Sequence, residues 1–378
     1  MSDVVELSDA ELDELRSTVR SFLESKSPED AVRKVMESES RYDPQVWAQM
    51  ADQLRLPGLA IPEAYGGDGF GQAALGVVLE EMGRALACSP FFATVVLGAQ
   101  ALLASGDTDA CARHLPGIAA GTTTAALAVA ERTGAWDPEE ITTRAVRRGE
   151  DGSGEWELTG TKSFVIDGAS ADLLLVMART TAGPSLFTVD RGAPDLTAEP
   201  METLDATRAM ARLRLDGTPA TLVGTEGAGG PLLARVLDLT AVGLAAEQAG
   251  GAARCLESST EYAGTRVQFG RPIGSFQAVK HKCADILVQV ELAQAAARES
   301  ARLADLGDDG FPVAAAAAHM TCSRAYMFAA SENIQVHGGI GFTWEHFAHL
   351  YFRRAKSSQL LLGGPSASRE RLLERLGI

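Results

Sequence analysis

The sequence lacks the features that define several classes of protein. Only five cysteines occur among 378 residues, and none forms a Cys-x-x-Cys pair, so neither a disulfide framework nor a cysteine zinc site is indicated. No uninterrupted apolar run reaches about 18 residues, so we expect no membrane-spanning helix. The acidic, amphipathic N-terminus differs from a signal peptide, and we therefore expect a cytoplasmic protein.

Positive charge is also scarce. The chain has 34 Lys and Arg against 50 Asp and Glu, which gives a formal net charge of −16. This balance argues against a nucleic-acid partner and against binding to an anionic membrane. No P-loop and no strand-embedded G-x-G-x-x-G occurs either, so no Rossmann-type nucleotide site is indicated.

The spacing of apolar residues changes twice along the chain. Helical spacing comes first, and Ser8 with Glu11 forms a capping-box pattern at the start of the first expected helix. From about residue 122, short Thr-, Val- and Leu-rich runs predict strands of a small antiparallel barrel or sandwich. Long helical patterns then return and indicate a bundle. We predict an α+β fold, mostly α, with domains at residues 1–121, 122–228 and 229–378.

Small residues recur in the first helix of the expected bundle. Ala245, Ala246, Gly250 and Gly251 either widen a pocket for a bulky ligand or allow tight helix packing. Tight packing is the interpretation we favour, because small side chains let two helices approach closely.

The stretch "RVQFGRPIGSFQAVKH" (residues 266–281) predicts an exposed, anchored turn between two helices. Arg266 can bind a diphosphate bidentately, and Phe269 can stack on an adenine or ribose edge. The alternative interpretation is a helix–helix corner with a surface salt bridge.

A second turn follows in "NIQVHGGIGFTWEHFAHLYFRRAK" (residues 333–356). Gln335 offers amide hydrogen bonds, and Gly338 with Gly339 permits close approach of the backbone to a ligand. Alone, each turn fits a structural corner as well as a binding site. Together they indicate a dinucleotide bound at the C-terminal bundle.

Two polar groups after the second turn have simpler interpretations. His346 and His349 form an H-x-x-H pattern on an expected helix, but zinc needs a third ligand, so we expect no metal. The basic cluster of Arg353, Arg354 and Lys356 is most simply a solvated helix face.

With these stretches in this order, the chain resembles the acyl-CoA dehydrogenase family over nearly its full length. The resemblance implies an N-terminal helical domain, a middle antiparallel β-barrel and a C-terminal four-helix bundle. It also implies FAD as cofactor, α,β-desaturation of an acyl-CoA thioester, and an electron-transferring flavoprotein as acceptor. Further matching stretches are "PEAYGGDGFG", "EEMGRALACSP", "HLPGIAAGTTTAALAVAE" and "LDATRAMARLRLDG".

The resemblance assigns cofactor contacts to two parts of the chain. In the bundle, the residues implied to bind the adenine–diphosphate half of FAD across a subunit interface are Arg266, Phe269, Gln277, Gln335, Gly338 and Gly339. In the middle domain, Val129 and Phe164 match flavin contacts. Three neighbouring positions depart from the family pattern: Ala130, Trp136 and Ile166 stand where hydroxyl side chains are usual.

The family's catalytic carboxylate is missing from the position where the resemblance places it. Most members carry Glu before Gly at a late bend, and this sequence has Gly363 followed by Gly364. A minority place the base at the position of Thr240. Asp238 lies two residues earlier and does not share a helix face with Thr240. We therefore assign no catalytic residue.

Three hypotheses follow from this combination. The first is the base-lacking subunit of an α2β2 acyl-CoA dehydrogenase, because "GFTWEH…HLY" looks like the steroid side-chain group in which two kinds of subunit share FAD. The second is a self-sufficient homo-oligomer with an unaligned base such as Asp238. The third is a flavin-free scaffold or acyl-CoA-binding protein.

Overall fold

The computed structural model describes residues 4–148 and 155–378, which form two compact units. Unit 1 consists of the chain up to Val5, Val35–Phe70 and Cys88–Thr240. Unit 2 consists of Glu6–Lys34, Gly71–Ala87 and Ala241–Ile378.

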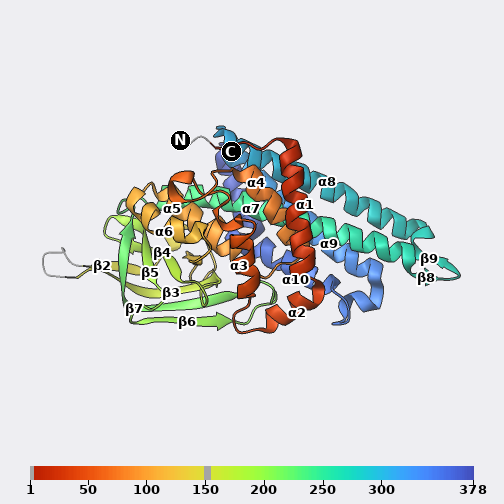
Figure 1. Ribbon diagram of the computed structural model, residues 1–378, viewed down its shortest axis with the longest axis horizontal. Helices are drawn as coiled ribbons and strands as arrows, with labels where there is room; N and C mark the ends of the chain where they lie inside the picture. Colours follow the sequence, from red (N-terminus) through yellow and green to blue (C-terminus); the bar gives the residue numbers. More distant parts are fainter. Residues whose placement is uncertain (1–3, 149–154) are drawn as a thin grey trace. The chain divides into compact units, whose positions relative to one another are not determined.

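The described part of unit 1 contains a seven-stranded sheet (Figure 1). The sheet closes on itself, because the order β1-β4-β2-β3-β7-β5 is completed by pairing of β5 with β4. Most pairs are antiparallel, as predicted, but β1 and β2 run parallel to β4. The strands are β1 Ala125–Ala128, β2 Arg144–Arg147, β3 Trp156–Ile166, β4 Leu173–Thr180, β5 Gly183–Asp190, β6 Leu196–Met201 and β7 Met210–Val223.

The barrel interior is filled by alternate apolar side chains of these strands. Trp156 packs edge-on against Phe187 with ring centroids 5.3 Å apart, and Leu213 and Leu215 are buried with them. Alternation places every second residue of a strand inside. Burial of such side chains stabilises the barrel by roughly 25 cal/mol for each Å² of apolar surface.

Helices complete unit 1. The segment η3, Phe92–Ala99, is a buried π-helix that continues into α5, Gln100–Ser105. It contacts β1, where the Thr94 hydroxyl accepts a hydrogen bond from the Ala125 amide at 3.1 Å. The other helical segments are α3 Pro44–Asp52, η1 Leu56–Gly58, η2 Glu63–Tyr65, α6 Thr108–Ala119 and η4 Pro138–Glu140.

Unit 2 is helical. Its first helix, α1 (Asp9–Lys26), begins with the predicted capping box of Ser8 and Glu11. Helix α7 (Gly229–Thr265) begins in unit 1 and continues into unit 2. The other elements are α2 Glu29–Glu37, which ends in unit 1, α4 Gln72–Arg84, β8 Val267–Gln268, β9 Arg271–Pro272, η5 Ile273–Ser275, α8 Gln277–Leu306, α9 Phe311–His337, η6 Gly338–Phe342, α10 Ala348–Leu360, η7 Leu361–Gly363 and α11 Gly364–Arg375.

Two glycines bring α4 and α7 into direct backbone contact. A Cβ on Gly83 would lie 1.9 Å from the Glu247 carbonyl oxygen, and a Cβ on Gly250 would lie 1.8 Å from that of Glu80. Gly251 meets the Tyr326 ring in the same way, at 2.4 Å. The small residues of α7 therefore serve close helix packing, which is the interpretation that the sequence favoured.

Among the described residues, α7 is the one helix long and apolar enough to cross a membrane by length and composition. The apolar window is 67% buried inside the protein. A buried core helix of a soluble protein meets the same criterion, so the helix is weak evidence for a membrane. Helical segments before and after a strand-rich middle confirm the predicted α+β fold; the domain bounds stay a prediction.

Candidate functional site

The two turns predicted to hold a dinucleotide lie at the same end of the bundle. Helices α8 and α9 are antiparallel neighbours, and Lys282 near the start of α8 forms an ion pair with Glu332 near the end of α9. The Tyr262 ring of α7 stacks on His337, the last residue of α9, with centroids 4.3 Å apart. Because these contacts join all three helices, we call residues 266–277 and 335–339 the bundle tip.

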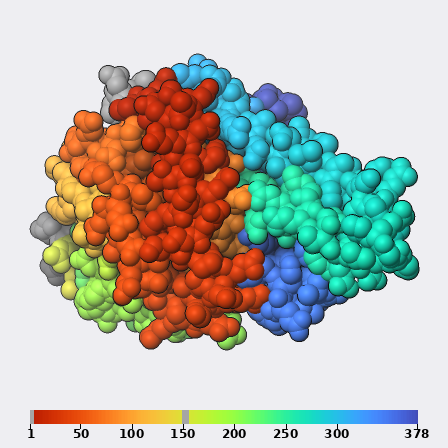
Figure 2. Space-filling view, turned by 45° about the vertical axis from the view of Figure 1, so that its right-hand side comes forward, coloured from red at the N-terminus to blue at the C-terminus, as the bar shows by residue number. Residues whose placement is uncertain are grey.

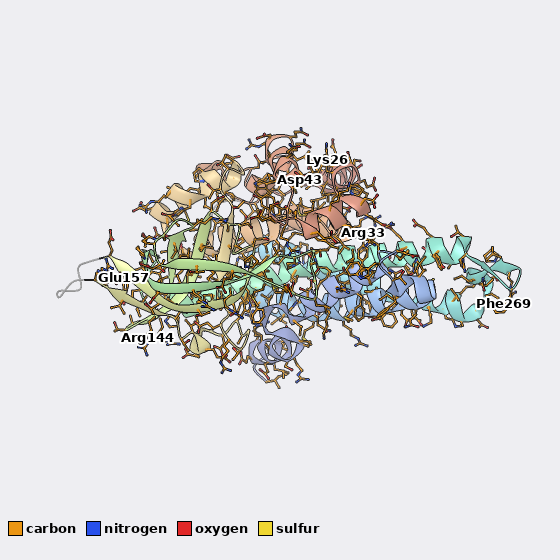
Figure 3. The ribbon with its side chains drawn as sticks, turned by 90° about the horizontal axis from the view of Figure 1, so that it is seen from below. Lys26, Arg33, Asp43, Arg144, Glu157 and Phe269 are labelled. Carbon is orange, nitrogen blue, oxygen red and sulfur yellow. The ribbon has the colours of Figure 1, made fainter. Side chains whose placement is uncertain are left out.

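The bundle tip presents polar and aromatic groups to the surface. In the space-filling view its hairpin, drawn in teal, stands out on the right (Figure 2). Phe269 is 91% exposed and lies at the outermost end of the hairpin (Figure 3). Arg266 is also exposed, and within the described ranges its guanidinium has no hydrogen-bond or ion-pair partner. An unpaired guanidinium is suited to a diphosphate.

The glycines of the bundle tip leave room for a ligand. Gly338 has φ +63° and ends α9, and apart from adjacent backbone no heavy atom of the described chain lies within 4 Å of a Cβ built on it or on Gly339. Gln335, in the last turn of α9, and Gln277, the first residue of α8, are also exposed. The arrangement fits the adenine–diphosphate half of a dinucleotide: two amides, an aromatic ring, a free cation and open backbone.

The middle-domain positions offer fewer polar contacts to a cofactor than the bundle tip does. Val129 is buried, and Phe164 is 38% exposed with a left-handed φ of +57° at a register shift of β3. The apolar side chains of Ala130, Trp136 and Ile166 are buried. Of these three side chains, only Trp136 can donate a hydrogen bond, through its indole N–H.

A buried ion pair, which the sequence analysis missed, fixes this same loop. The Lys162 side chain has no exposed surface, and its Nζ donates to Glu131 Oε1 at 2.9 Å and to the Val129 carbonyl at 3.0 Å. Glu131 also accepts from the amides and hydroxyls of Thr142 and Thr143. The sequence signal for this ion pair was Lys162, a charged residue at an inward-facing position of β3.

Both members of the pair have shifted pKa values. Burial lowers the pKa of Lys162 to about 8, against the attraction of Glu131. Burial by itself raises the pKa of Glu131, but the charge of Lys162 and the hydrogen bonds from Thr142, Lys162 and Thr143 bring it down to about 2. At neutral pH both groups are charged, so the pair locks residues 129–131 onto β3.

The positions implied for a catalytic base carry no free acid. Gly363 lies in a tight turn between Leu362 and Gly364, and all three have left-handed φ angles, of +90°, +58° and +76° respectively. In unit 1, Thr240 is buried and its hydroxyl donates to the Val236 carbonyl at 2.7 Å. Asp238 is buried on the same helix.

Two interpretations of the polar groups after the bundle tip are corrected. His346 precedes α10 and only His349 lies in it, because the chain turns through residues 343–347. Within residues 4–148 and 155–378 no group of three His, Cys, Asp or Glu is arranged to hold a metal. Arg354 does not lie on a solvated face but forms a buried ion pair with Glu247 at 2.7 Å.

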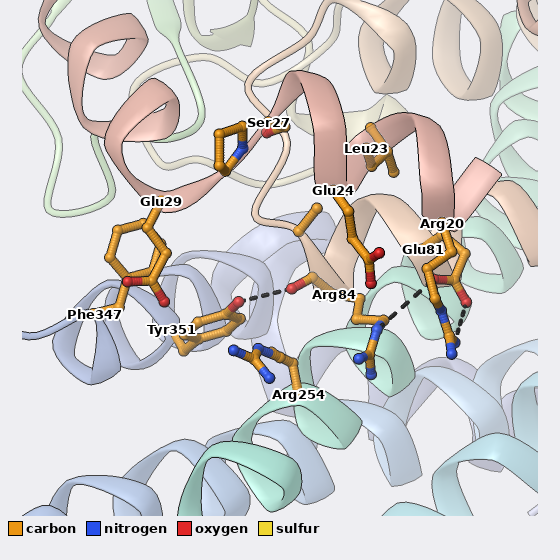
Figure 4. Close-up of a pocket in the computed structure, with 12 residues that line it drawn as sticks. Arg20, Leu23, Glu24, Ser27, Glu29, Glu81, Arg84, Arg254, Phe347 and Tyr351 are labelled. Atoms are coloured by element: carbon orange, nitrogen blue, oxygen red, sulfur yellow. Dashed lines mark hydrogen bonds and ion pairs between the residues drawn. The ribbon is translucent and has the colours of Figure 1, made fainter. Parts of the chain in front are cut away.

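Unit 2 also contains a pocket of about 330 Å³ (Figure 4). It is lined by helices α1, α2, α4, α7 and α10, and its arginines face acids: Arg20 pairs with Glu81 at 2.8 Å, and Arg84 pairs with Glu257. The charges of these arginines and glutamates neutralise one another, so the pocket does not bring together a group of residues suited to catalysis. Its residues are Arg20, Leu23, Glu24, Ser27, Pro28, Glu29, Glu81, Arg84, Ala85, Arg254, Phe347 and Tyr351.

Comparisons with known proteins cover the whole described architecture. The N-terminal domain of acyl-CoA dehydrogenases matches residues 9–122, the middle domain residues 126–218 and the C-terminal domain residues 227–377. The acyl-CoA dehydrogenase IpdE2 of Mycobacterium tuberculosis is 37% identical over 95% of both chains.

Two solved structures are similar throughout. The Tcur3481-Tcur3483 steroid ACAD, solved as a variant, is 34% identical with a TM-score of 0.86 and covers 97% of this chain and 98% of that one. The ChsE4-ChsE5 complex from Mycobacterium tuberculosis is 29% identical with a TM-score of 0.88 and covers 98% of both. The chain therefore belongs to the acyl-CoA dehydrogenase family of oxidoreductases.

Proposed function

We propose that this chain is the subunit of an FAD-dependent acyl-CoA dehydrogenase that lacks the catalytic glutamate and completes the FAD site of a partner subunit. The observation that carries the proposal is the difference between two sets of residues. The bundle tip keeps an exposed, unpaired Arg266 and an exposed Phe269, whereas Gly363 and Thr240 occupy the positions implied for the base.

The residues of the bundle tip divide the work of holding the adenine–diphosphate half of FAD. The Arg266 guanidinium would neutralise the diphosphate, and the Phe269 ring would stack on the adenine or ribose. Open backbone at Gly338 and Gly339 would let the cofactor approach closely, with amide contacts from Gln277 and Gln335. When bound, FAD supplies the hydride acceptor of the reaction.

Removal of the substrate's α-proton needs a carboxylate that this chain does not place at either implied position. A base must lie within hydrogen-bond reach of the proton that it removes. Gly363 has no side chain, and the Thr240 hydroxyl is already bonded to its own helix. The partner subunit therefore provides the base in this proposal.

The partner that we propose is a second acyl-CoA dehydrogenase chain in an α2β2 assembly. Similarity to ChsE4-ChsE5, which is described as a complex, and to a steroid ACAD with two named components supports this choice. The same similarity favours a steroid-derived acyl-CoA thioester as the substrate. An electron-transferring flavoprotein is the proposed electron acceptor.

Purification of the chain with and without its partner tests the proposal. Alone, the chain should contain well under one FAD per chain and show no bleaching of flavin absorbance by acyl-CoA. The co-expressed complex should contain FAD and bleach on addition of substrate. Stoichiometric FAD with acyl-CoA-dependent bleaching in the chain alone would overturn the proposal and favour a self-sufficient homo-oligomer.

The scaffold hypothesis needs a separate measurement. Titration calorimetry of the flavin-free chain with CoA thioesters should detect no tight binding if the proposal is correct. Tight binding of a CoA thioester, together with no flavin in any complex, would favour an acyl-CoA-binding protein instead.

A further inference from the structure

Three aromatic rings lie directly behind the bundle tip. The Tyr262 ring of α7 stacks on the His337 ring of α9 at 4.3 Å with an interplanar angle of 29°. His337 in turn lies 4.2 Å from the His346 ring, which belongs to the segment before α10. We call Tyr262, His337 and His346 the ring stack, because together they join α7, the end of α9 and the segment before α10.

Hydrogen bonds fix both imidazoles in defined neutral forms. His337 Nδ1 lies 2.8 Å from the Asn333 carbonyl oxygen, which only accepts, so Nδ1 carries the proton. His346 Nδ1 accepts from the Ala348 amide at 3.1 Å, so in this ring Nδ1 is unprotonated. The Asn333 side chain is itself held, since its Oδ1 accepts from the Ser259 hydroxyl at 2.9 Å.

The ring stack lies within a few residues of both turns of the bundle tip. His337 immediately precedes Gly338, the residue that ends α9. The Arg266 amide donates to the Tyr262 carbonyl at 2.8 Å, so Arg266 lies one helical turn after Tyr262. Any shift of His337 relative to Tyr262 therefore moves Gly338 relative to Arg266.

We propose that His337 is a positioning residue that holds the two turns of the bundle tip in register for a dinucleotide diphosphate, and that it does so only while neutral. This inference rests on the proposed function and goes beyond it, because it names a pH-dependent element of the site. A proton on either imidazole places a positive charge against the other ring and removes an acceptor from the stack.

The surroundings of the two rings make protonation disruptive. Burial lowers the pKa of His337, and the neighbouring His346 ring lowers it further, against the Asn333 carbonyl, which raises it. Burial and the charge of Arg33 on α2 lower the pKa of His346. The charged and titratable neighbours of the two imidazoles are Arg33, which acts on His346, and His349, whose own pKa His346 lowers; no carboxylate contributes to the shift of His337 or His346.

Calorimetric titration of the full-length chain with ADP tests the inference. ADP carries the adenine and diphosphate alone, so its binding reports on the bundle tip without the flavin ring. Wild-type affinity should fall between pH 7.5 and pH 5.5 by less than roughly tenfold, or about 1.4 kcal/mol, because the pKa of His337 is lowered from its ordinary value. In His337→Phe, which keeps a flat ring but cannot titrate, the fall should shrink to the part that comes from the terminal phosphate of ADP, which itself gains a proton near pH 6.

A matched control separates positioning from general loss of stability. His114→Phe also removes a histidine whose pKa is lowered by burial, but in unit 1, and it should keep the wild-type pH profile. An unchanged pH profile in His337→Phe would overturn this inference while leaving the proposed function intact. Absence of any ADP binding by the wild-type chain would instead overturn the dinucleotide site, and with it the proposed function.

Discussion

The polar groups of the middle-domain loop (residues 129–131, with Lys162 of β3) are paired with one another, whereas those of the bundle tip are exposed. In the loop, Lys162 and Glu131 are paired with each other and with backbone, and the side chains around them are buried. At the bundle tip, Arg266 and the two glutamines are exposed and Arg266 has no side-chain partner in the described chain. Polar groups that satisfy one another stabilise a fold, whereas polar groups left open are available to a ligand.

The largest effect should come from breaking the loop's ion pair. Glu131→Ala leaves the Lys162 ammonium buried without its carboxylate, which costs about 3–5 kcal/mol of unfolding free energy. Chemical denaturation measures this loss. Glu140→Ala, which removes an exposed acid bonded to Thr133, is the control and should change stability by less than about 0.5 kcal/mol. Equal losses in both variants would contradict the comparison.

The same kind of substitution at the bundle tip should change binding and not stability. Arg266→Ala removes an unpaired guanidinium, so ADP affinity should fall roughly 10- to 100-fold, because each hydrogen bond to a charged group contributes about 1.5–3 kcal/mol. Unfolding free energy should stay unchanged. Arg298→Ala on the exposed face of α8 is the matched control. If it weakens ADP binding as much, the effect is one of net charge.

Acid should weaken the ion pair of the loop more than it weakens an exposed ion pair. The pKa of Glu131 is lowered to about 2 from 4.5, so its contribution to stability is fully present above pH 4.5 and is lost as the pH falls toward 2. Glu131→Gln should flatten this acid limb in urea titrations at pH 2 to 5. Glu299→Gln, at an exposed pair with Arg302, should flatten it much less. A steeper limb in Glu131→Gln is incompatible with the pairing described.

Gly363→Glu should destabilise the chain without creating activity. A left-handed residue other than glycine costs roughly 1–2 kcal/mol, and a Cβ at this position would lie 2.8 Å from the Ala367 Cβ. Thermal unfolding of this variant and of Gly106→Glu, which has φ +67° and open space, isolates the crowding. Acyl-CoA-dependent bleaching gained by Gly363→Glu in the absence of a partner would contradict the expectation.

The smallest effect is expected from Asp238→Asn. Asp238 and Thr240 are two residues apart on α7 and so do not share a face, which leaves Asp238 poorly placed to serve as a base. Turnover by the complex should stay within about twofold of wild type. Asp285→Asn, on the exposed surface of α8, is the reference. Abolished turnover with unchanged stability would favour the homo-oligomer that uses Asp238.

Local patterns in the sequence were enough for much of the fold. The capping box at Ser8 and Glu11 is confirmed, and the long helices and most strands lie where the apolar spacing predicts them. The short strands β2 and β6 were not predicted, because four to six residues carry little periodicity. The parallel pairing of β4 with β1 was missed because these two strands are distant in sequence.

The candidate site was predictable to a similar degree. The two turns of the bundle tip were found from their arginine, aromatic and glycine residues, and the structure brings them together through Tyr262 and His337. Their role in binding FAD stays a prediction. The pairs Lys162–Glu131 and Arg354–Glu247 were missed, since each joins residues distant in sequence. Only Lys162, at an inward position of β3, gave a sign of burial.

The run of three left-handed residues from Leu362 to Gly364 has an evolutionary consequence. On the proposed function, one codon change at Gly363 restores the acid but puts it on a backbone that L-residues rarely adopt. On that proposal, Gly363→Glu alone loses stability without gaining activity, so a return to self-sufficiency needs further substitutions that relieve the turn. The proposed dependence on a partner would then be hard to reverse, and the genes for the two subunits should be inherited together.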